Sequence, residues 1–371
     1  MKENGNMPNL HKLQPPHFAG IDYIKVVACF SVLLVHFRLN VQYTIPANTF
    51  GRFVALFMAT DYELFITSVP LFFMCTGYLM LNKKFSYDYY IKLGKVLLLY
   101  LMCSLLTYVI LVAIKHQTLA VHQIWDGIRT YQLIGYAWYV KIYATLYLLI
   151  PFINLLIARF NEANKYWLLA LIGVLMLAVG LPTPLSTGFG INFPINYHVI
   201  YQLYPYVYYL IGAYLRKFPI KINWQWLLSV EILTTVAGIG INMLRRAPFV
   251  GGAEGNYPSL LVMVQSLALF MLINALANRP TKWVSWLSKY TLPIYLMSFV
   301  VDMYIYPFFI HLLGSGKATI PYALVIGIVV FGLSLALTLI AEAVTNFIWP
   351  YLYRVLGMPQ MLWRKPVKVS Q

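Results

Sequence analysis

Charged side chains are scarce in this sequence. Only 10% of the 371 residues are Asp, Glu, Lys or Arg, and the mean hydropathy is +0.70. A soluble globular domain carries about 25% charged residues. A chain this apolar cannot cover its surface with water-facing groups, which excludes a soluble enzyme or binding module. We therefore expect a membrane protein whose main solvent is the lipid bilayer.

Acidic residues are rarer still, with 11 against 27 basic residues and a net charge of +16. In a soluble protein this balance would suggest a nucleic-acid partner. Here the basic residues lie between long apolar stretches, so we expect no nucleic acid. Membrane lipids are the expected partner, with anionic headgroups facing the basic loops.

Cysteine is also rare. Cys29, Cys75 and Cys103 all fall in apolar stretches and lack the spacing of a disulfide framework or a metal site, so we expect no bound metal. They are typical of small core residues.

No hydrophilic segment is long enough to build a soluble core of its own, so residues 1–371 are interpreted as a single domain.

Long apolar stretches recur along the whole chain. A helix needs about 20 apolar residues to cross the hydrocarbon. Stretches that meet this need cover residues 18–38, 63–82, 94–114, 137–157, 166–182, 199–215, 226–244, 258–277, 290–312 and 321–349. The sequence predicts an all-α fold, a polytopic bundle of about ten transmembrane helices in the cell (plasma) membrane. The first stretch is too long for a cleavable signal peptide and lacks a small-residue cleavage site, so we expect it to remain as a span.

The loops between these stretches alternate between rich and poor in lysine and arginine. If the N-terminus lies inside, 18 basic residues fall on the cytoplasmic side and 7 on the outer side. Lys25 and Lys141 are left within the membrane. Because basic loops stay in the cytoplasm, this asymmetry predicts that both termini are cytoplasmic.

The first stretch contains ionisable residues, which are costly in lipid and by default candidates for function. Asp22 and Lys25 lie near its cytoplasmic end, and His36 follows eleven residues after Lys25. Eleven residues make about three helical turns, so Lys25 and His36 share one face, with Cα atoms about 16 Å apart. Lys25 could instead extend its amine to the interface, and His36 could be an interfacial hydrogen-bonding residue. The shared face favours catalytic roles for Lys25 and His36.

Other membrane charges are weaker candidates. Asp302 lies deep in its stretch and should have a partner, for which Lys141 is one hypothesis among several. Lys92 and Lys95 share a face at the start of the third stretch. They are either ordinary cytoplasmic flanking residues or a cationic cradle for an anion that enters from the cytoplasm.

Several motifs occur in an order that resembles the integral-membrane acyltransferase family 3. Asp22-x-x-Lys25-x10-His36 resembles that family's first-helix signature, in which a basic residue precedes the histidine by the same interval. The stretch 69–78, which includes Thr76, is similar to the second-helix motif. Later landmarks of the family are matched by Lys92-x-x-Lys95, Trp138-Tyr139 with Pro151, Gly212 and the stretch 292–296.

The resemblance implies a membrane O-acetyltransferase of surface polysaccharides, in a form without a soluble C-terminal domain. Members move an acyl group, commonly acetyl, from cytoplasmic acyl-CoA to a hydroxyl of a glycan or its lipid-linked precursor. Lys25, Lys92 and Lys95 would bind the polyanionic donor. His36 would be the general base or would carry the acyl group as an acyl-imidazole.

The resemblance also implies supporting roles, and the residues in such positions are Asp22, Thr76, Trp138 and Asp302. Three departures stand out: lysine replaces arginine at 25, 92 and 95, Thr76 replaces the usual serine, and Ser298 stands where many members have a histidine. Two alternatives remain open: a transporter or exporter of polysaccharide or lipid-linked glycan, and an inactive scaffold or sensor. The sequence leaves the acyl group, the acceptor and a homodimer undecided.

Overall fold

The computed structural model describes residues 18–40, 60–115, 118–182, 185, 191, 197–244, 256–277 and 279–363. Within these residues the chain is helical and contains no strand, which confirms the predicted all-α fold. The helices are α1 (Ala19–Asn40), α3 (Ser68–Met80), α4 (Tyr87–Lys115), α5 (Val121–Arg129), α6 (Trp138–Ala158), α7 (Lys165–Gly180), α8 (Tyr197–Tyr201), α9 (Tyr204–Lys217), α10 (Trp224–Leu244), α11 (Leu260–Leu276), α12 (Lys282–Leu287), α13 (Thr291–Leu313), α14 (Gly316–Thr319) and α15 (Ala323–Trp363).

Each predicted apolar stretch is helical, although the stretch 199–215 is divided between α8 and α9. Seven described spans are long and apolar enough to cross a membrane: Ala19–Asn40, Thr60–Met80, Tyr87–Ile114, Trp138–Ala158, Trp224–Ile241, Thr291–Leu313 and Ile320–Leu356. Helices α7 and α11 are apolar but shorter. Helix α9 has 14 residues, most of them buried. The polytopic bundle is therefore confirmed, with some helices shorter than the sequence predicts.

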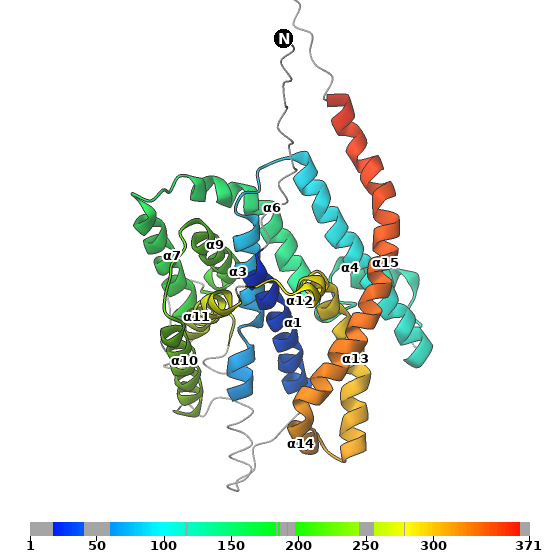
Figure 1. The fold of residues 1–371 in the computed structure, drawn as a ribbon. Coiled ribbons are helices and arrows are strands. Elements are labelled where there is room, and N and C mark those ends of the chain that lie inside the picture. Colours follow the sequence, from blue (N-terminus) through cyan, green and yellow to red (C-terminus); the bar gives the residue numbers. More distant parts are fainter. Residues whose placement is uncertain are drawn as a thin grey trace, which may run out of the picture.

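Helix α1 is the centre of the bundle. It packs against α3 and α11 on one side and against α13 and α15 on the other (Figure 1). The second half of α1 is buried without interruption from Ser31 to Arg38. A helix surrounded by protein needs no polar face, which is why the sequence of α1 is apolar all round. Its ionisable side chains are therefore held inside the protein rather than at a lipid-facing surface.

Two glycines bring α3 and α9 into backbone contact. A Cβ atom on Gly77 of α3 would overlap the carbonyl oxygen of Tyr209, and one on Gly212 of α9 would overlap the carbonyl oxygen of Met74. Small residues that allow close approach are typical of helix pairs in membranes. This contact gives a structural reason for the glycine after Thr76 and for Gly212, both of which belong to the motifs described above.

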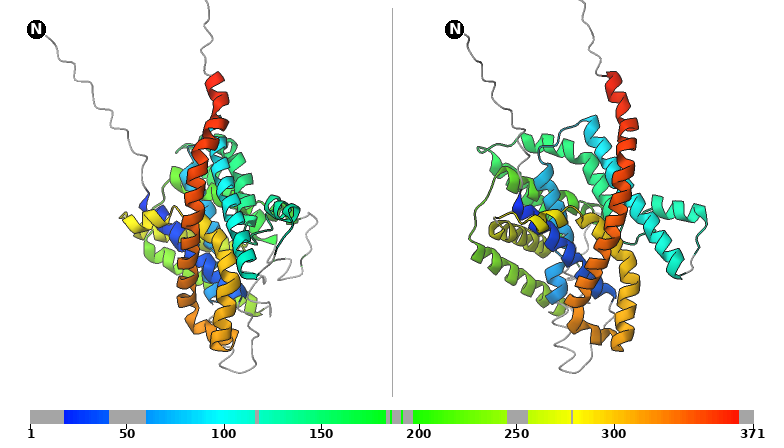
Figure 2. Two further views of the ribbon diagram at one scale, coloured as in Figure 1. Left: turned by 90° about the vertical axis from the view of Figure 1, so that its right-hand side faces the viewer. Right: turned by 45° about the vertical axis from the view of Figure 1, so that its right-hand side comes forward.

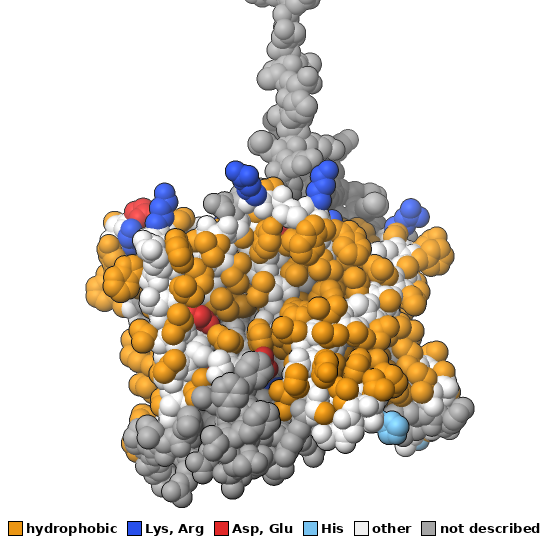
Figure 3. Space-filling model, turned by 60° about the horizontal axis from the view of Figure 1, so that its bottom comes forward, with side chains coloured by type: hydrophobic (Ala, Val, Ile, Leu, Met, Phe, Trp, Pro, Cys, Tyr) orange, Lys and Arg blue, Asp and Glu red, His pale blue; other side chains and the backbone are white. Residues whose placement is uncertain are grey.

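The surface between the ends of the bundle is apolar. Hydrophobic side chains cover a broad belt, and lysine and arginine side chains gather along one rim (Figure 3). The α3–α4 connection and the end of α15 lie at the same end of the molecule, and α1 begins well below them (Figures 1 and 2). That end is the one for which the loop charges predict a cytoplasmic location; the sidedness itself stays a prediction.

Candidate active site

His36 lies in the last third of α1, enclosed by aromatic rings. Its side chain is 7% exposed. The ring of Tyr136, in the turn before α6, stacks on the imidazole with 3.6 Å between centroids, and the ring of Tyr295 from α13 lies at 5.7 Å. Asn40 Nδ2 donates a hydrogen bond to the backbone carbonyl of His36 (2.8 Å) at the end of α1. The orientation of the imidazole is therefore restricted by Tyr136 stacked on one face and by Tyr295 beside it.

Asp302 of α13 is the charged neighbour of this histidine. Its Oδ2 lies 3.6 Å from His36 Nδ1 and accepts a hydrogen bond from the Tyr136 hydroxyl at 2.8 Å. A carboxylate that is 2% exposed in a membrane helix requires such partners. The hypothesis that Lys141 pairs with Asp302 is wrong, because Lys141 is exposed and the neighbours of Asp302 include His36, Tyr136 and Tyr306 instead.

The His36–Asp302 arrangement has the chemistry of a catalytic base with an orienting carboxylate. Asp302 faces Nδ1, so Nε2, on the other side of the imidazole, is left for a reacting group. A carboxylate in this position favours the tautomer with the proton on Nδ1 and stabilises the imidazolium that forms when Nε2 takes a proton. The 3.6 Å separation is slightly long for a hydrogen bond, as is common for catalytic groups without bound substrate.

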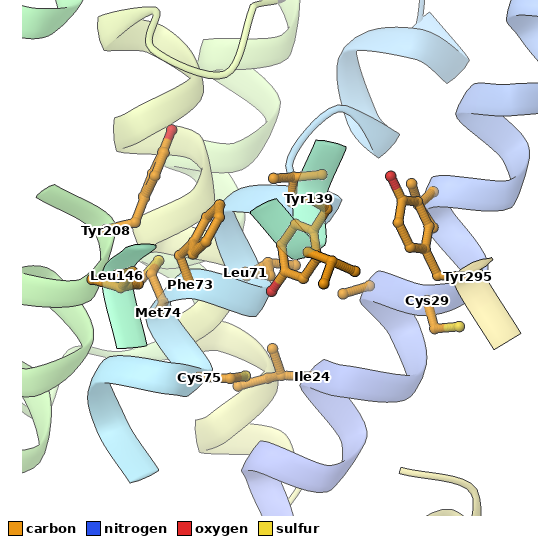
Figure 4. Close-up of a cluster of buried hydrophobic side chains, with 14 of the residues drawn as sticks. Ile24, Cys29, Leu71, Phe73, Met74, Cys75, Tyr139, Leu146, Tyr208 and Tyr295 are labelled. Carbon is orange, nitrogen blue, oxygen red and sulfur yellow. The ribbon is translucent and has the colours of Figure 1, made fainter. Parts of the chain in front are cut away.

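A cavity opens between α1, α3, α6 and α13. Its lining residues are Lys25, Val32, Val69, Phe72, Cys75, Thr76, Leu79, Met80, Tyr139, Tyr143, Ser288, Lys289, Thr291, Leu292 and Tyr295. Figure 4 labels Cys75, Tyr139 and Tyr295 among them, which come from α3, α6 and α13. Tyr295 also contacts His36, so its ring connects the lining of the cavity with the histidine.

Lys25 lines the cavity as a half-buried side chain. Among the residues that the structure describes, no carboxylate lies within ion-pair distance of its amine. Asp22, one turn earlier, accepts a hydrogen bond from Ser288 Oγ at 2.7 Å, which joins the start of α1 to the segment before α13. A lysine in an apolar cavity without a salt bridge is suited to bind an anionic or carbonyl oxygen of a ligand.

Comparison with known proteins decides the family. The family described as an acyltransferase domain, acyltransferase family 3, matches residues 18–339. The chain belongs to this family. No curated protein and no solved structure matches it.

Only some of the sequence-predicted site residues line the cavity of this membrane acyltransferase. Lys25 and Thr76 line it, and Thr76 Oγ1 donates to the carbonyl of Phe72 at 2.9 Å. Lys92 lies outside it, in an ion pair with Asp88 at 2.6 Å, and Lys95 is not among the lining residues either. The ring of Trp138 stacks on that of Tyr257, with centroids 5.7 Å apart, and the next residue, Tyr139, lines the cavity instead.

The sequence-based prediction assigns no role to four residues of the candidate site: Tyr136, Tyr139, Lys289 and Tyr295. Tyr139 and Tyr295 belong to the motifs, so their position there is the signal that could have found them. Lys289 is counted only as a cytoplasmic flanking charge, although it lines the cavity. Ser298 is fully buried, and its Oγ donates to the carbonyl of Tyr295 at 2.9 Å.

We expect Asp302→Asn to lower the turnover number of the acyltransferase by about 100-fold or more, because the amide no longer favours the tautomer that leaves Nε2 unprotonated. The folded state should be retained, since an amide can still accept the hydrogen bond from Tyr136. The measurement is kcat for Asp302→Asn, His36→Gln and the double variant. If Asp302 acts through His36, the double variant is no slower than His36→Gln; multiplicative losses would contradict this role.

Proposed function

We propose that the protein transfers an acyl group, by preference acetyl, from cytoplasmic acyl-CoA to a hydroxyl of a cell-surface glycan or its lipid-linked precursor at the plasma membrane. One observation carries the proposal: the ring of Tyr295 lines the cavity that contains Lys25 and also contacts His36, whose Nδ1 faces Asp302. The family supplies acyl transfer as the reaction class. Donor, acceptor and residue roles are the proposed part.

The donor is expected to bind with its charged end toward Lys289 and its acyl end toward Tyr295. Lys289 is exposed and Lys25 is half-buried, and both line the cavity, so cations are available to phosphate and carbonyl oxygens. Lys92 and Lys95 remain predicted donor contacts outside the cavity, where Asp88 already neutralises Lys92.

The reaction at His36 can take two routes. In the first, Nε2 removes the proton of the acceptor hydroxyl, the oxygen attacks the thioester carbonyl, the C–S bond breaks, and the thiolate of CoA leaves with the proton. In the second, Nε2 itself attacks the carbonyl, the C–S bond breaks and CoA leaves as the thiolate. The hydroxyl then attacks the acyl-imidazole, the N–C bond breaks, and the proton of the hydroxyl passes by way of the freed imidazole to the thiolate. Acid quench of a single turnover with labelled donor distinguishes the two routes, because only the second leaves label on the protein.

The acceptor is expected to reach His36 from the outer side. His36 is four residues from the end of α1 at Asn40, which is about 6 Å along the helix axis. With the N-terminus in the cytoplasm, this end of α1 faces outward. A hydroxyl on an extracytoplasmic glycan therefore needs to enter the bundle by little more than one helical turn.

The proposal is tested with purified protein in lipid vesicles, radiolabelled acetyl-CoA and cell-envelope glycan. We expect label in the glycan and release of free CoA in equal amounts. If no acyl-CoA supports transfer while labelled glycan crosses the vesicle membrane, the protein is an exporter and the proposal is wrong.

Removing a cation from the cavity should weaken donor binding. We expect Lys25→Met and Lys289→Met each to raise the KM for acetyl-CoA by about 10- to 100-fold, since a hydrogen bond to a charged group contributes about 1.5–3 kcal/mol. Lys282→Met is the matched control, because Lys282 is an exposed lysine of α12 that does not line the cavity. An unchanged KM in both cavity variants would place the donor elsewhere.

A further inference from the structure

The donor cavity changes from exposed to buried along its length. Leu79, near the end of α3, is 45% exposed, and Lys289 is exposed as well. Val69 and Val32, which line the same cavity, are each 1% exposed. From Leu79 to Val69 the cavity follows α3 for ten residues, or about 15 Å. The cavity therefore has an open mouth and a closed inner end.

Two tyrosines close the inner end. The rings of Tyr139 and Tyr295 meet edge to face with centroids 5.9 Å apart (Figure 4). Tyr295 is 4% exposed, and its hydroxyl donates to the carbonyl of Tyr136 at 2.9 Å. Its ring therefore cannot turn aside without losing this hydrogen bond and the contact with Tyr139. A ligand that enters from the mouth is stopped by a ring that is fixed at two points.

The proposed reacting groups are neighbours of the same ring. Tyr295 lies 5.7 Å from the ring of His36 and 5.8 Å from the ring of Tyr136, with which it is stacked. A thioester that is to react near His36 must therefore stop beside Tyr295. At the inner end, Tyr295, Val32 and Val69 bound the space that remains for the acyl chain.

We propose that Tyr295 is the residue that determines the length of the acyl group: its ring ends the cavity so that only a short chain fits while the thioester lies near His36. This rests on the proposed function, because it takes acyl-CoA as the donor. A longer chain has to displace the ring or hold the thioester back toward the mouth. One methylene that does not fit a closed apolar pocket changes discrimination by about 10- to 200-fold.

The experiment measures release of free CoA from acetyl-, butyryl-, hexanoyl- and octanoyl-CoA, with the ratio of kcat/KM for octanoyl to acetyl as the readout. Wild type should use acetyl-CoA and hardly any octanoyl-CoA. In Tyr295→Ala the ratio should rise by at least about tenfold. Tyr295→Phe keeps the ring and should keep the wild-type preference for acetyl.

Tyr143→Ala is the matched control. Tyr143 lines the cavity one turn along α6 from Tyr139, on the side away from Tyr136. The substitution also removes a tyrosine ring from the cavity lining, but it leaves Tyr295 at the inner end. Whatever happens to its rate, its octanoyl-to-acetyl ratio should equal that of wild type. Val32→Phe tests the opposite change, because the larger side chain fills the inner end. It should reduce kcat/KM for butyryl-CoA more than for acetyl-CoA. This variant is the deciding test if Tyr295→Ala does not fold.

The failures of the two proposals are distinguishable. If wild type releases CoA from octanoyl-CoA as efficiently as from acetyl-CoA, or if neither Tyr295→Ala nor Val32→Phe changes the chain-length profile, the role of Tyr295 is wrong and acyl-CoA remains the donor. If wild type releases CoA from no acyl-CoA, the proposed function is wrong and the role of Tyr295 fails with it.

Discussion

His36→Gln is expected to reduce acyl transfer by about 100- to 10,000-fold, the range that a positioned general acid–base group contributes. Glutamine has a similar size and can hydrogen-bond, but it can neither take a proton from the acceptor hydroxyl nor carry the acyl group. The loss should appear in kcat, because Lys25 and the rest of the donor cavity are unchanged. Label transfer from acetyl-CoA to glycan, measured at saturating donor, checks this expectation.

The matched control is His311→Gln, which changes an exposed histidine in the last turn of α13. It should transfer acyl groups at the wild-type rate. Size-exclusion profiles and thermal unfolding in detergent should be alike for both variants, since neither substitution changes the packed volume greatly. Transfer at the wild-type rate in His36→Gln would remove His36 from the reaction and leave the cavity without its catalytic group.

Gly212→Ala is expected to have the largest effect on stability. The new methyl group would overlap the backbone carbonyl of Met74, and a backbone atom cannot be moved aside by a change of rotamer. Overpacking in a well-packed interior costs about 1–3 kcal/mol and occasionally more, and we expect the upper end of this range. Gly77→Ala meets the carbonyl of Tyr209 in the same way and should behave alike.

The effect should extend to the active site, because α3 carries the cavity residues Val69, Cys75 and Thr76. Separation of α3 from α9 would displace this wall and lower activity together with the unfolding temperature. Gly173→Ala is the control: nothing lies within 4 Å of its added Cβ, so this variant of α7 should be as stable as wild type or more stable. Equal unfolding temperatures for Gly212→Ala and Gly173→Ala would contradict the proposed close contact.

Much of the fold follows from the sequence alone. The apolar stretches predict the positions of the spans because a backbone in lipid must satisfy its hydrogen bonds internally, which leaves the helix as the local solution. Helix ends are less well predicted: α9 has only 14 residues, because burial among neighbouring helices removes the need to match the thickness of the bilayer. The family motifs likewise depend on residues close together in sequence.

The candidate site is predicted only in part. The interval between Lys25 and His36 fixes their common face on α1, and Asp302 is identifiable as a buried charge in need of a partner. That this partner is His36, and that Tyr136 donates a hydrogen bond to the same carboxyl group, follows only from the tertiary packing. The same packing brings Lys289 to the cavity of Lys25, although its sequence context marks it only as a flanking charge.

The sequence by itself determined that the protein lies in the membrane as a helical bundle and that α1 carries a lysine and a histidine on one face. Both properties depend on local quantities, the transfer of side chains into lipid and the pitch of a helix. Only the tertiary structure decided that Tyr295 contacts both the cavity of Lys25 and His36, and that Asp302 faces the imidazole. These contacts join residues far apart in the chain, and their distances are set by helix packing, which no single segment encodes.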